Sequence, residues 1–175
     1  MTDVTTNALR GIVKTLDDVV LPAIPADDPL AIQELKMVSR YLAFSRQRVE
    51  HLYARARYEL EFYAGVASEC AEALGKAAPQ LADLEAGVAA ARDLLAKPGA
   101  AIGALRVQTQ RLMTRLSRLL LEVEDADALA RVERIVVRRS AEITAFDRSW
   151  YLPLKLERFP GDVRPLASFI AIHES

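Results

Sequence analysis

A chain of 175 residues with a formal net charge of −1 is long enough to bury a hydrophobic core and lacks the basic excess typical of nucleic-acid-binding proteins. Its single cysteine, Cys70, excludes an internal disulfide and fits a reducing compartment. Residues 1–20 are too polar for a signal peptide, and no window approaches about 18 uncharged apolar residues. We therefore expect a cytoplasmic protein that binds neither nucleic acid nor a membrane.

The first predicted helix begins at Thr2 or Asp3, either of which can cap it, and ends near Leu21. Its apolar residues recur three or four positions apart: Leu9, Ile12, Val13, Leu16, Val19 and Val20. Prolines within residues 22–28 lack a backbone donor and crowd the preceding turn, so we expect this segment to lie outside any helix interior. Asp28 followed by Pro29 then predicts a new helix start, with a carboxylate cap and a ring preset to helical φ.

Residues 28–78 are predicted to form a very long second helix, because no proline occurs between Pro29 and Pro79. Residues spaced alternately three and four positions apart form an apolar seam along this stretch: Leu35, Val38, Leu42, Ser45, Val49, Leu52 and Ala56. After one extra step of four, called a stutter, the seam continues with Leu60, Tyr63, Ala67, Cys70 and Leu74. An unbroken helix of about 50 residues would span roughly 75 Å, against a radius of gyration of roughly 16 Å for a compact domain. We expect either an elongated bundle or a bend, at the stutter between residues 56 and 60 or at Gly65.

Gly75 and Pro79 mark the turn that follows, and a third helix is predicted from about residue 80 to residue 96. The sequence Lys97-Pro98-Gly99 ends it with a basic residue, a helix breaker and a flexible joint.

The helical pattern resumes at residue 100 and continues to residue 152 in two sets that fall out of phase at residues 124–127. This acidic patch is either a helix end with a new cap at Asp125 or Asp127, or a kink within one long helix. Because it contains neither glycine nor proline, we favour a kink or a very tight joint.

The final segment, residues 153–175, is an irregular tail punctuated by prolines. Residues 164–172 are predicted to form a last half-helix, with Leu166, Phe169 and Ile170 packing back on the remainder of the chain. No stretch alternates convincingly as a strand would. We predict a single all-α domain, with an antiparallel bundle of about five helices over residues 1–152 and the tail packed on it.

Residues that could support metal, cofactor or nucleophilic chemistry are sparse. The Glu-x-x-His pairs of di-iron bundles are absent, since Arg48 stands three residues before His51 and Ile170 three before His173. One cysteine and two distant histidines also argue against zinc. Cys70 falls on the apolar seam and is predicted to be an inert hydrophobic side chain. We expect no metal, no cofactor and no catalytic residue.

A second stripe on the long helix is the one candidate site. Its members repeat three and four apart: Met37, Tyr41, Phe44, Arg48, His51, Arg55, Tyr58 and Phe62. Guanidinium groups bind carboxylates or phosphates bidentately, and aromatic neighbours can orient them. The candidate ligand-binding residues are therefore Tyr41, Arg48, His51, Arg55 and Tyr58. The favoured alternative is a second packing face, with the arginines paired to acids such as Glu34, Glu50 or Glu59.

A further run of arginines begins at Arg106 and continues with Arg111, Arg115 and Arg118, then Arg131, Arg134, Arg138 and Arg139. Acidic residues are interleaved with it, and aromatic residues that could stack on bases are missing. We interpret this run as a solvated face with salt bridges.

The first 60 or so residues, and especially residues 16–50, resemble a small uncharacterised bacterial helical family. The matched features are the first helix ending in Val20, Leu21, Pro22 and Ala23, a short polar loop, and arginines 46 and 48 in the long second helix. Members of that family are encoded beside aminoglycoside-phosphotransferase-like and acyl-CoA-dehydrogenase-like genes. The resemblance covers about a third of the chain and implies no activity or functional residue.

The leading functional hypothesis is a non-enzymatic interaction or scaffold protein that binds another protein or a second copy of itself. The alternative is an accessory protein that holds an anionic ligand between helices, such as a carboxylate, a phosphate or an acyl-CoA, through Arg48, His51 and Arg55. An open cavity around these side chains would favour the ligand hypothesis, and carboxylate partners in a closed interior would favour packing.

Overall fold

The computed structural model describes residues 4–74 and 81–171, and this part of the chain is helical without a strand. Its α-helices are α1 (Val4–Thr15), α2 (Leu21–Ala23), α3 (Pro29–Arg48), α4 (Leu52–Leu74), α5 (Leu81–Leu95), α6 (Ile102–Glu122) and α7 (Ala126–Tyr151). The predicted all-α class is confirmed, as is the long second helical stretch, which α3 and α4 form together.

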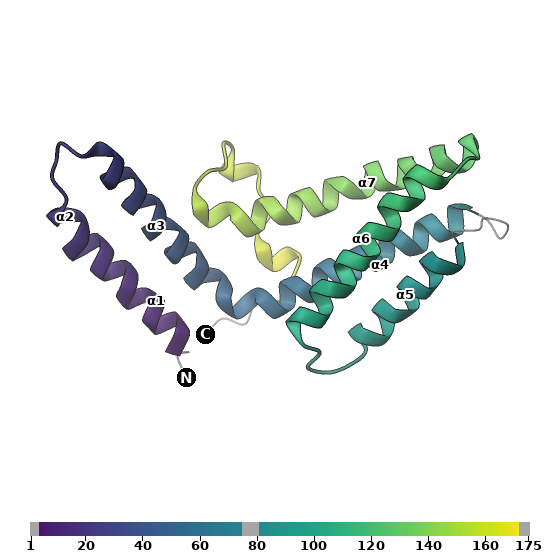
Figure 1. Cartoon of the computed structure of the whole chain (residues 1–175), viewed down its shortest axis with the longest axis horizontal. Helices are drawn as coiled ribbons and strands as arrows, with labels where there is room; N and C mark the ends of the chain where they lie inside the picture. The colour runs from purple at the N-terminus through teal and green to yellow at the C-terminus, as the bar shows by residue number, and fades with distance from the viewer. Residues whose placement is uncertain (1–3, 75–80, 172–175) are drawn as a thin grey trace.

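The helices are arranged in two parts that diverge from a common vertex (Figure 1). Helices α1 and α3 lie antiparallel, side by side, and with α2 form the N-terminal hairpin, residues 4–48. Helices α4, α5, α6 and α7 form the bundle, residues 52–151, which contains the main hydrophobic core. Leu60, Leu105 and Leu112 are fully enclosed there. The hairpin differs sharply, because α1 has no buried residue and α3 has only Ser39.

Helix α1 continues through a π-helical segment, Leu16–Val20, into the short α2, so Pro22 and Ala23 lie in the last helical turn. The prediction kept residues 22–28 out of any helix interior, and Pro22 and Ala23 nevertheless extend the helix to its final turn. The wider π turn accounts for the difference, because the Leu21 amide donates to the Leu16 carbonyl and the proline stands at the start of the next turn. The predicted start at Pro29 is confirmed, with Asp28 accepting a hydrogen bond of 3.0 Å from the Ala31 amide.

The long helical stretch bends at a 3₁₀ turn, Val49–His51, where α3 ends and α4 begins (Figure 1). The predicted positions, residues 56–60 and Gly65, were wrong, because both lie within α4. At the bend, Arg48 ends α3 with a φ of −114°, well away from the usual helical value of about −63°. Gly65 lies within α4, and the Arg139 guanidinium lies 3.5 Å from where a Cβ would stand, which is an ordinary contact distance.

The bundle follows the apolar pattern closely. Helix α5 ends at Leu95, within one residue of the prediction. Between α6 and α7 the helix ends and restarts: the Asp125 carboxylate accepts hydrogen bonds of 2.9 Å from the amides of Asp127 and Ala128. The joint is tight, as expected, but it separates two capped helices, so the kinked single helix was wrong.

The tail turns back onto the bundle through single 3₁₀ turns, Leu152–Leu154, Pro160–Asp162 and Leu166–Ser168, rather than through the predicted half-helix. Leu166 and Ile170 are buried with Phe146 and Trp150 in a second hydrophobic cluster. Several predictions fall outside the described residues: the caps Thr2 and Asp3, the helix end at 75–78, the turn at Gly75 and Pro79, the helix start at 80, Ile172 and His173. Within the described ranges, no helix combines the length and apolar character that crossing a membrane requires.

Candidate functional site

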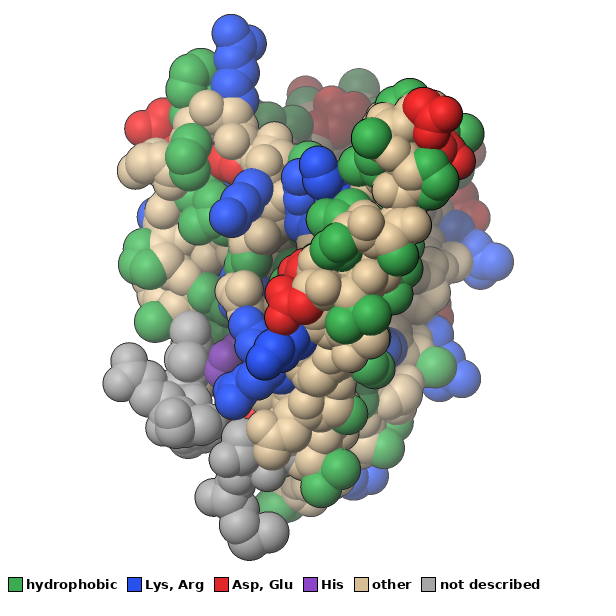
Figure 2. Space-filling model, turned by 90° about the vertical axis from the view of Figure 1, so that its left-hand side faces the viewer, with side chains coloured by type: hydrophobic (Ala, Val, Ile, Leu, Met, Phe, Trp, Pro, Cys, Tyr) green, Lys and Arg blue, Asp and Glu red, His purple; other side chains and the backbone are tan. Residues whose placement is uncertain are grey.

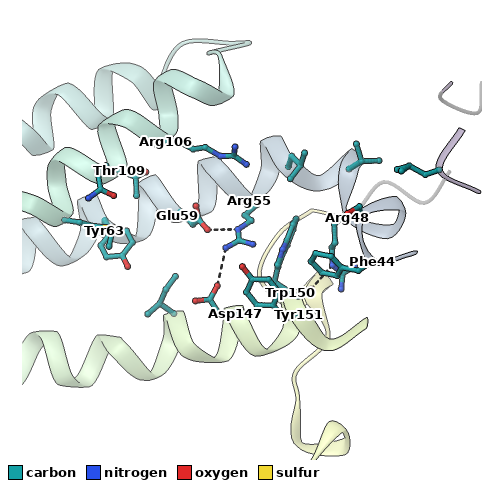
Figure 3. A pocket seen from close by; sticks show the side chains of 17 residues that line it. Phe44, Arg48, Arg55, Glu59, Tyr63, Arg106, Thr109, Asp147, Trp150 and Tyr151 are labelled. Carbon is teal, nitrogen blue, oxygen red and sulfur yellow. Dashed lines mark hydrogen bonds and ion pairs between the residues drawn. The ribbon is translucent and has the colours of Figure 1, made fainter. Parts of the chain in front are cut away.

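A cleft of about 640 Å³ opens where the hairpin meets the bundle (Figure 3). Its lining comes from both parts of the molecule: Leu9, Phe44 and Arg48 from the hairpin, Arg55, Glu59 and Tyr63 from α4, Arg106, Gln110 and Met113 from α6, and Asp147, Trp150 and Tyr151 from α7. The cleft therefore depends on the bend at residues 49–51, which sets the hairpin against the end of α7.

Arg48 is bound to the C-terminal end of α7. Its Nε donates a hydrogen bond of 2.9 Å to the carbonyl of Trp150, and its Nη2 donates one of 3.3 Å to the carbonyl of Ser149. The last carbonyls of a helix lack partners within the helix, and the helix dipole favours a cation there. Burial lowers the pKa of Arg48, but an arginine stays charged at any physiological pH.

Arg55 lies at the centre of the cleft, between two carboxylates. Its Nε donates to Glu59 at 2.6 Å, its Nη2 donates to Asp147 at 3.5 Å, and its guanidinium carbon lies 4.6 Å from the centre of the Trp150 ring. Burial lowers the pKa of Arg55, but hydrogen bonds and charge from Glu59 and Tyr151 outweigh burial and raise the pKa overall. Figure 3 shows this group of side chains converging from α4 and α7.

Asp147 and Tyr63 lie at the floor of the cleft, where both are partly buried. Burial is the first cause that raises the pKa of Asp147, with Arg55 opposing it and Glu59 adding to it. Burial also raises the pKa of Tyr63, with further contributions from Asp147 and Glu59. Negative charge at this floor is therefore costly, and Arg55 is the cation that offsets it.

The candidate residues His51 and Tyr58 do not line this cleft. They line a second groove, between α4 and the tail, together with Phe169. The Tyr58 hydroxyl donates to Glu142 at 3.5 Å, and its ring lies 4.3 Å from that of Phe146. Burial, followed by the charge of Glu142, raises the pKa of Tyr58 to about 12.

Tyr41 lies further along α3, is 49% exposed and lines neither the cleft nor the second groove. The predicted stripe is thus divided by α7, which packs along its α4 half: Trp150 lies against Arg55 on one side, and Phe146 lies against Tyr58 on the other. Of the five candidates, the structure brings Arg48 and Arg55 together at the cleft. Packing, the favoured alternative, accounts for the hydrogen bonds of both.

Sequence reasoning missed the contributions of α6 and α7 to this site. Arg106 was assigned to a solvated, salt-bridged face, and further along that run Arg115 does pair with Asp83 at 3.0 Å. Arg106, however, borders the cleft, and among the described residues it forms no hydrogen bond or ion pair. The sequence did contain a signal: Arg106 and Arg115 are nine residues apart, which places them on opposite sides of a helix, about 180° from each other.

Cys70 is buried in the bundle, and burial raises the pKa of its thiol to about 11, with the charge of Glu69 adding to the effect. The thiolate, which is the nucleophilic form, is therefore scarce near neutral pH. The described residues also contain no group of three or more histidine, cysteine, aspartate or glutamate side chains that could hold a metal ion.

Comparisons with known proteins give no further guide: no family model, no curated protein and no solved structure matches the chain. The resemblance of the first 60 or so residues to a bacterial helical family stays a prediction. Function must therefore be argued from the surfaces and the cleft themselves.

Proposed function

We propose that this chain is a cytoplasmic, non-enzymatic interaction protein that associates with a second copy of itself through the N-terminal hairpin. The observation that carries the proposal is the contrast in burial. Most of the stability of a helix in a folded protein comes from packing its apolar face, yet α1 buries no residue. Its own antiparallel partner, α3, buries only Ser39, through a hydrogen bond of 2.6 Å to Asp17.

The apolar surface of the hairpin is extensive and exposed. Leu30, Met37 and Tyr41 are seven and four residues apart, so they share one face of α3, and each is more than 40% exposed. Val4, Ile12 and Val19 are similarly exposed in the first helical stretch. Figure 2, which views the molecule from the hairpin side, shows apolar side chains interspersed with charged ones on this surface. Several exposed apolar residues on one face, as here, are typical of a protein-binding surface.

This face also continues an existing interface. Phe44 and Arg48 follow Met37 and Tyr41 on the same face of α3, and they contact the end of α7, with the Phe44 and Tyr151 rings 5.7 Å apart. The bundle covers the half of the face nearest the bend and leaves the half nearest the hairpin tip exposed. A partner that packs on the exposed half would extend a surface that already packs on helical structure.

The charges of the hairpin indicate which partner fits. The tip, residues 15–35, contains five acidic residues and no lysine or arginine: Asp17, Asp18, Asp27, Asp28 and Glu34. The base, residues 4–14 and 36–47, contains five basic residues and no acidic one: Arg10, Lys14, Lys36, Arg40 and Arg46. A second hairpin in the antiparallel orientation would set its acidic tip over this basic base, and its basic base over this acidic tip.

Such pairing has the symmetry expected of a homodimer. A two-fold interface uses the same patch on both subunits and must therefore be complementary to itself. The charge pattern meets this condition only in the antiparallel arrangement, because parallel hairpins would place acid on acid and base on base. Two paired hairpins would form a four-helix arrangement, in which the exposed apolar residues of both chains are covered.

Analytical ultracentrifugation of the full chain tests the proposal. We expect a dimer at micromolar concentrations that weakens as salt screens the opposed charges. Met37→Asp, which places a charge in the apolar surface, should raise the dissociation constant at least about tenfold, the equivalent of 1.4 kcal/mol. Val137→Asp is the matched control, because Val137 is 72% exposed on α7, and this variant should associate normally.

Charge reversal gives a second, sharper readout. Glu34→Lys and Arg40→Glu should each weaken association. The chain with both substitutions should regain it, because the charges of tip and base are then exchanged at these two positions and each again faces its opposite in the partner. A chain that is monomeric under all these conditions, or a Met37→Asp variant that associates as tightly as the wild type, would refute the proposal.

A further inference from the structure

The cleft at the junction of hairpin and bundle has the dimensions of a small-molecule site. Its volume of about 640 Å³ falls within the range of roughly 300–1,000 Å³ found for ligand pockets. Its lining combines side chains from five helical segments, α1, α3, α4, α6 and α7. Pockets at the meeting point of separate structural parts are preferred ligand sites. The proposed self-association does not use this cleft.

The charges of the lining leave one cation without a partner. Three guanidinium groups, those of Arg48, Arg55 and Arg106, face two carboxylates, those of Glu59 and Asp147. Arg48 is occupied by the carbonyls of α7, and Arg55 by both carboxylates. The balance is therefore one positive charge, and it belongs to Arg106, which extends from α6 toward the space beside Arg55 (Figure 3).

The remaining lining is apolar and aromatic. Phe44, Trp150 and Tyr151 stand on the side of the hairpin and α7, and Met113 stands on α6. Gln110 lies one helical turn after Arg106 on α6 and offers an amide donor beside the guanidinium. A ligand that fills this space would place its apolar surface against the aromatic rings and its anionic group near Arg106, at the N-terminal end of α6.

We infer that the cleft binds a small monoanion with an apolar or aromatic body, whose carboxylate or similar anionic group pairs with Arg106. A guanidinium fork matches a carboxylate in a bidentate geometry, and Gln110 can donate to the same group. The rings of Phe44 and Tyr151 and the side chain of Met113 cover the apolar body. A dianion would leave one charge without a partner, because Arg48 and Arg55 already have their hydrogen-bond partners within the fold.

A cationic ligand fits this site poorly. An amine would have to displace Arg55 from Glu59 and Asp147, and Arg55 also occupies the face of Trp150 at 4.6 Å. Its bond to Glu59, at 2.6 Å, is the shorter of the two. The amine would in addition meet the free positive charge of Arg106. The guanidinium of Arg55 thus already occupies the position that a cationic ligand would take in this cleft.

Binding can be followed through Trp150, which is the only tryptophan of the chain and lines the cleft. We would titrate the full chain with 2-naphthoate and with octanoate, using 2-naphthamide as a neutral analogue, and record tryptophan fluorescence together with calorimetry. At least one of the two monoanions should bind and change the Trp150 signal. Its affinity should exceed that of the neutral amide by about tenfold or more, because hydrogen bonds to charged groups are the stronger ones.

Arg106→Gln is the decisive variant, because Arg106 is exposed and its replacement should leave the fold intact, as circular dichroism can verify. It should weaken anion binding about tenfold and leave binding of the neutral amide unchanged. Arg111→Gln, on the same helix but outside the cleft lining, is the matched control and should bind like the wild type. Absence of binding by either anion, or equal affinity in wild type and Arg106→Gln, would overturn the inference.

Discussion

The hairpin and the bundle are built from the same kind of amphipathic helix but differ in what covers the apolar face. In the bundle, Leu60, Leu112 and Val132 are completely enclosed by neighbouring helices. In the hairpin, Ile12 remains 47% exposed although it belongs to an equally regular apolar pattern. Periodicity therefore determines where a helix forms and which face is apolar, but it does not determine whether the same chain supplies the partner for that face.

The largest expected difference between the two regions comes from truncating one apolar side chain in each. Phe146 is fully buried and contacts Tyr58, Trp150 and Phe169. Phe146→Ala should lower the free energy of unfolding by about 3–5 kcal/mol, because it leaves a cavity. Ile12→Ala should change it by no more than about 0.5 kcal/mol when measured on dilute, monomeric protein. Urea denaturation monitored by circular dichroism measures both, and comparable losses would contradict the contrast.

A smaller effect is expected where the two regions join. Arg48→Ala removes two hydrogen bonds from a charged group to the carbonyls of Ser149 and Trp150, at a cost on the order of 1–3 kcal/mol. Hydrogen exchange should rise in the last turn of α7 and near the bend at residues 49–51, and should stay unchanged in α5. Arg111→Ala, which removes an exposed arginine of α6, serves as the control. Unchanged exchange at the end of α7 would show that Arg48 does not hold the two regions together.

The smallest expected effect concerns the cap of α7, within the bundle. Hydrogen bonds from the amides of Ala128 and Asp127 lower the pKa of Asp125. A carboxyl group with a lowered pKa in the folded state stabilises the fold above its unfolded pKa, and this contribution is lost as the pH falls through the folded pKa. Asp125→Asn keeps a cap oxygen but removes the titration, so its stability should depend less on pH below about 3.9 than that of the wild type.

Urea denaturation at neutral and at acidic pH measures this difference. Glu124→Gln, at the neighbouring exposed position, is the control and should keep the acid-side dependence of the wild type. Equal pH dependence in the Asp125→Asn variant and the wild type would rule out the carboxylate cap as its source.

The course of the helices was largely predictable from sequence, because capping and apolar spacing are local signals. The start at Asp28 and Pro29 and the end of α5 followed directly from them. The bend did not, because it lies at residues 48–51 without glycine or proline and coincides with contacts to residues about a hundred positions later. Gly65, the local signal, lies within α4 and does not bend it.

The site was predictable only on the side of α3 and α4. Arg48 and Arg55 could be selected from helical spacing, but spacing could not show that α7 would pack along the stripe and separate His51 and Tyr58 from them. Arg106 and Asp147 come from helices whose position relative to α4 is set by tertiary packing. A periodic pattern within one helix contains no information about which other helices meet at its surface.

The attachment of Arg48 to α7 has a mechanical consequence. The hairpin is an arm that joins the bundle at residues 49–51, and Arg48, next to this joint, ties the arm to the last turn of α7. Any rotation of the arm must move that turn or break both hydrogen bonds. The same turn continues into the tail and carries Trp150, so a displacement at the hairpin tip would be transmitted both to the cleft and to the C-terminal segment.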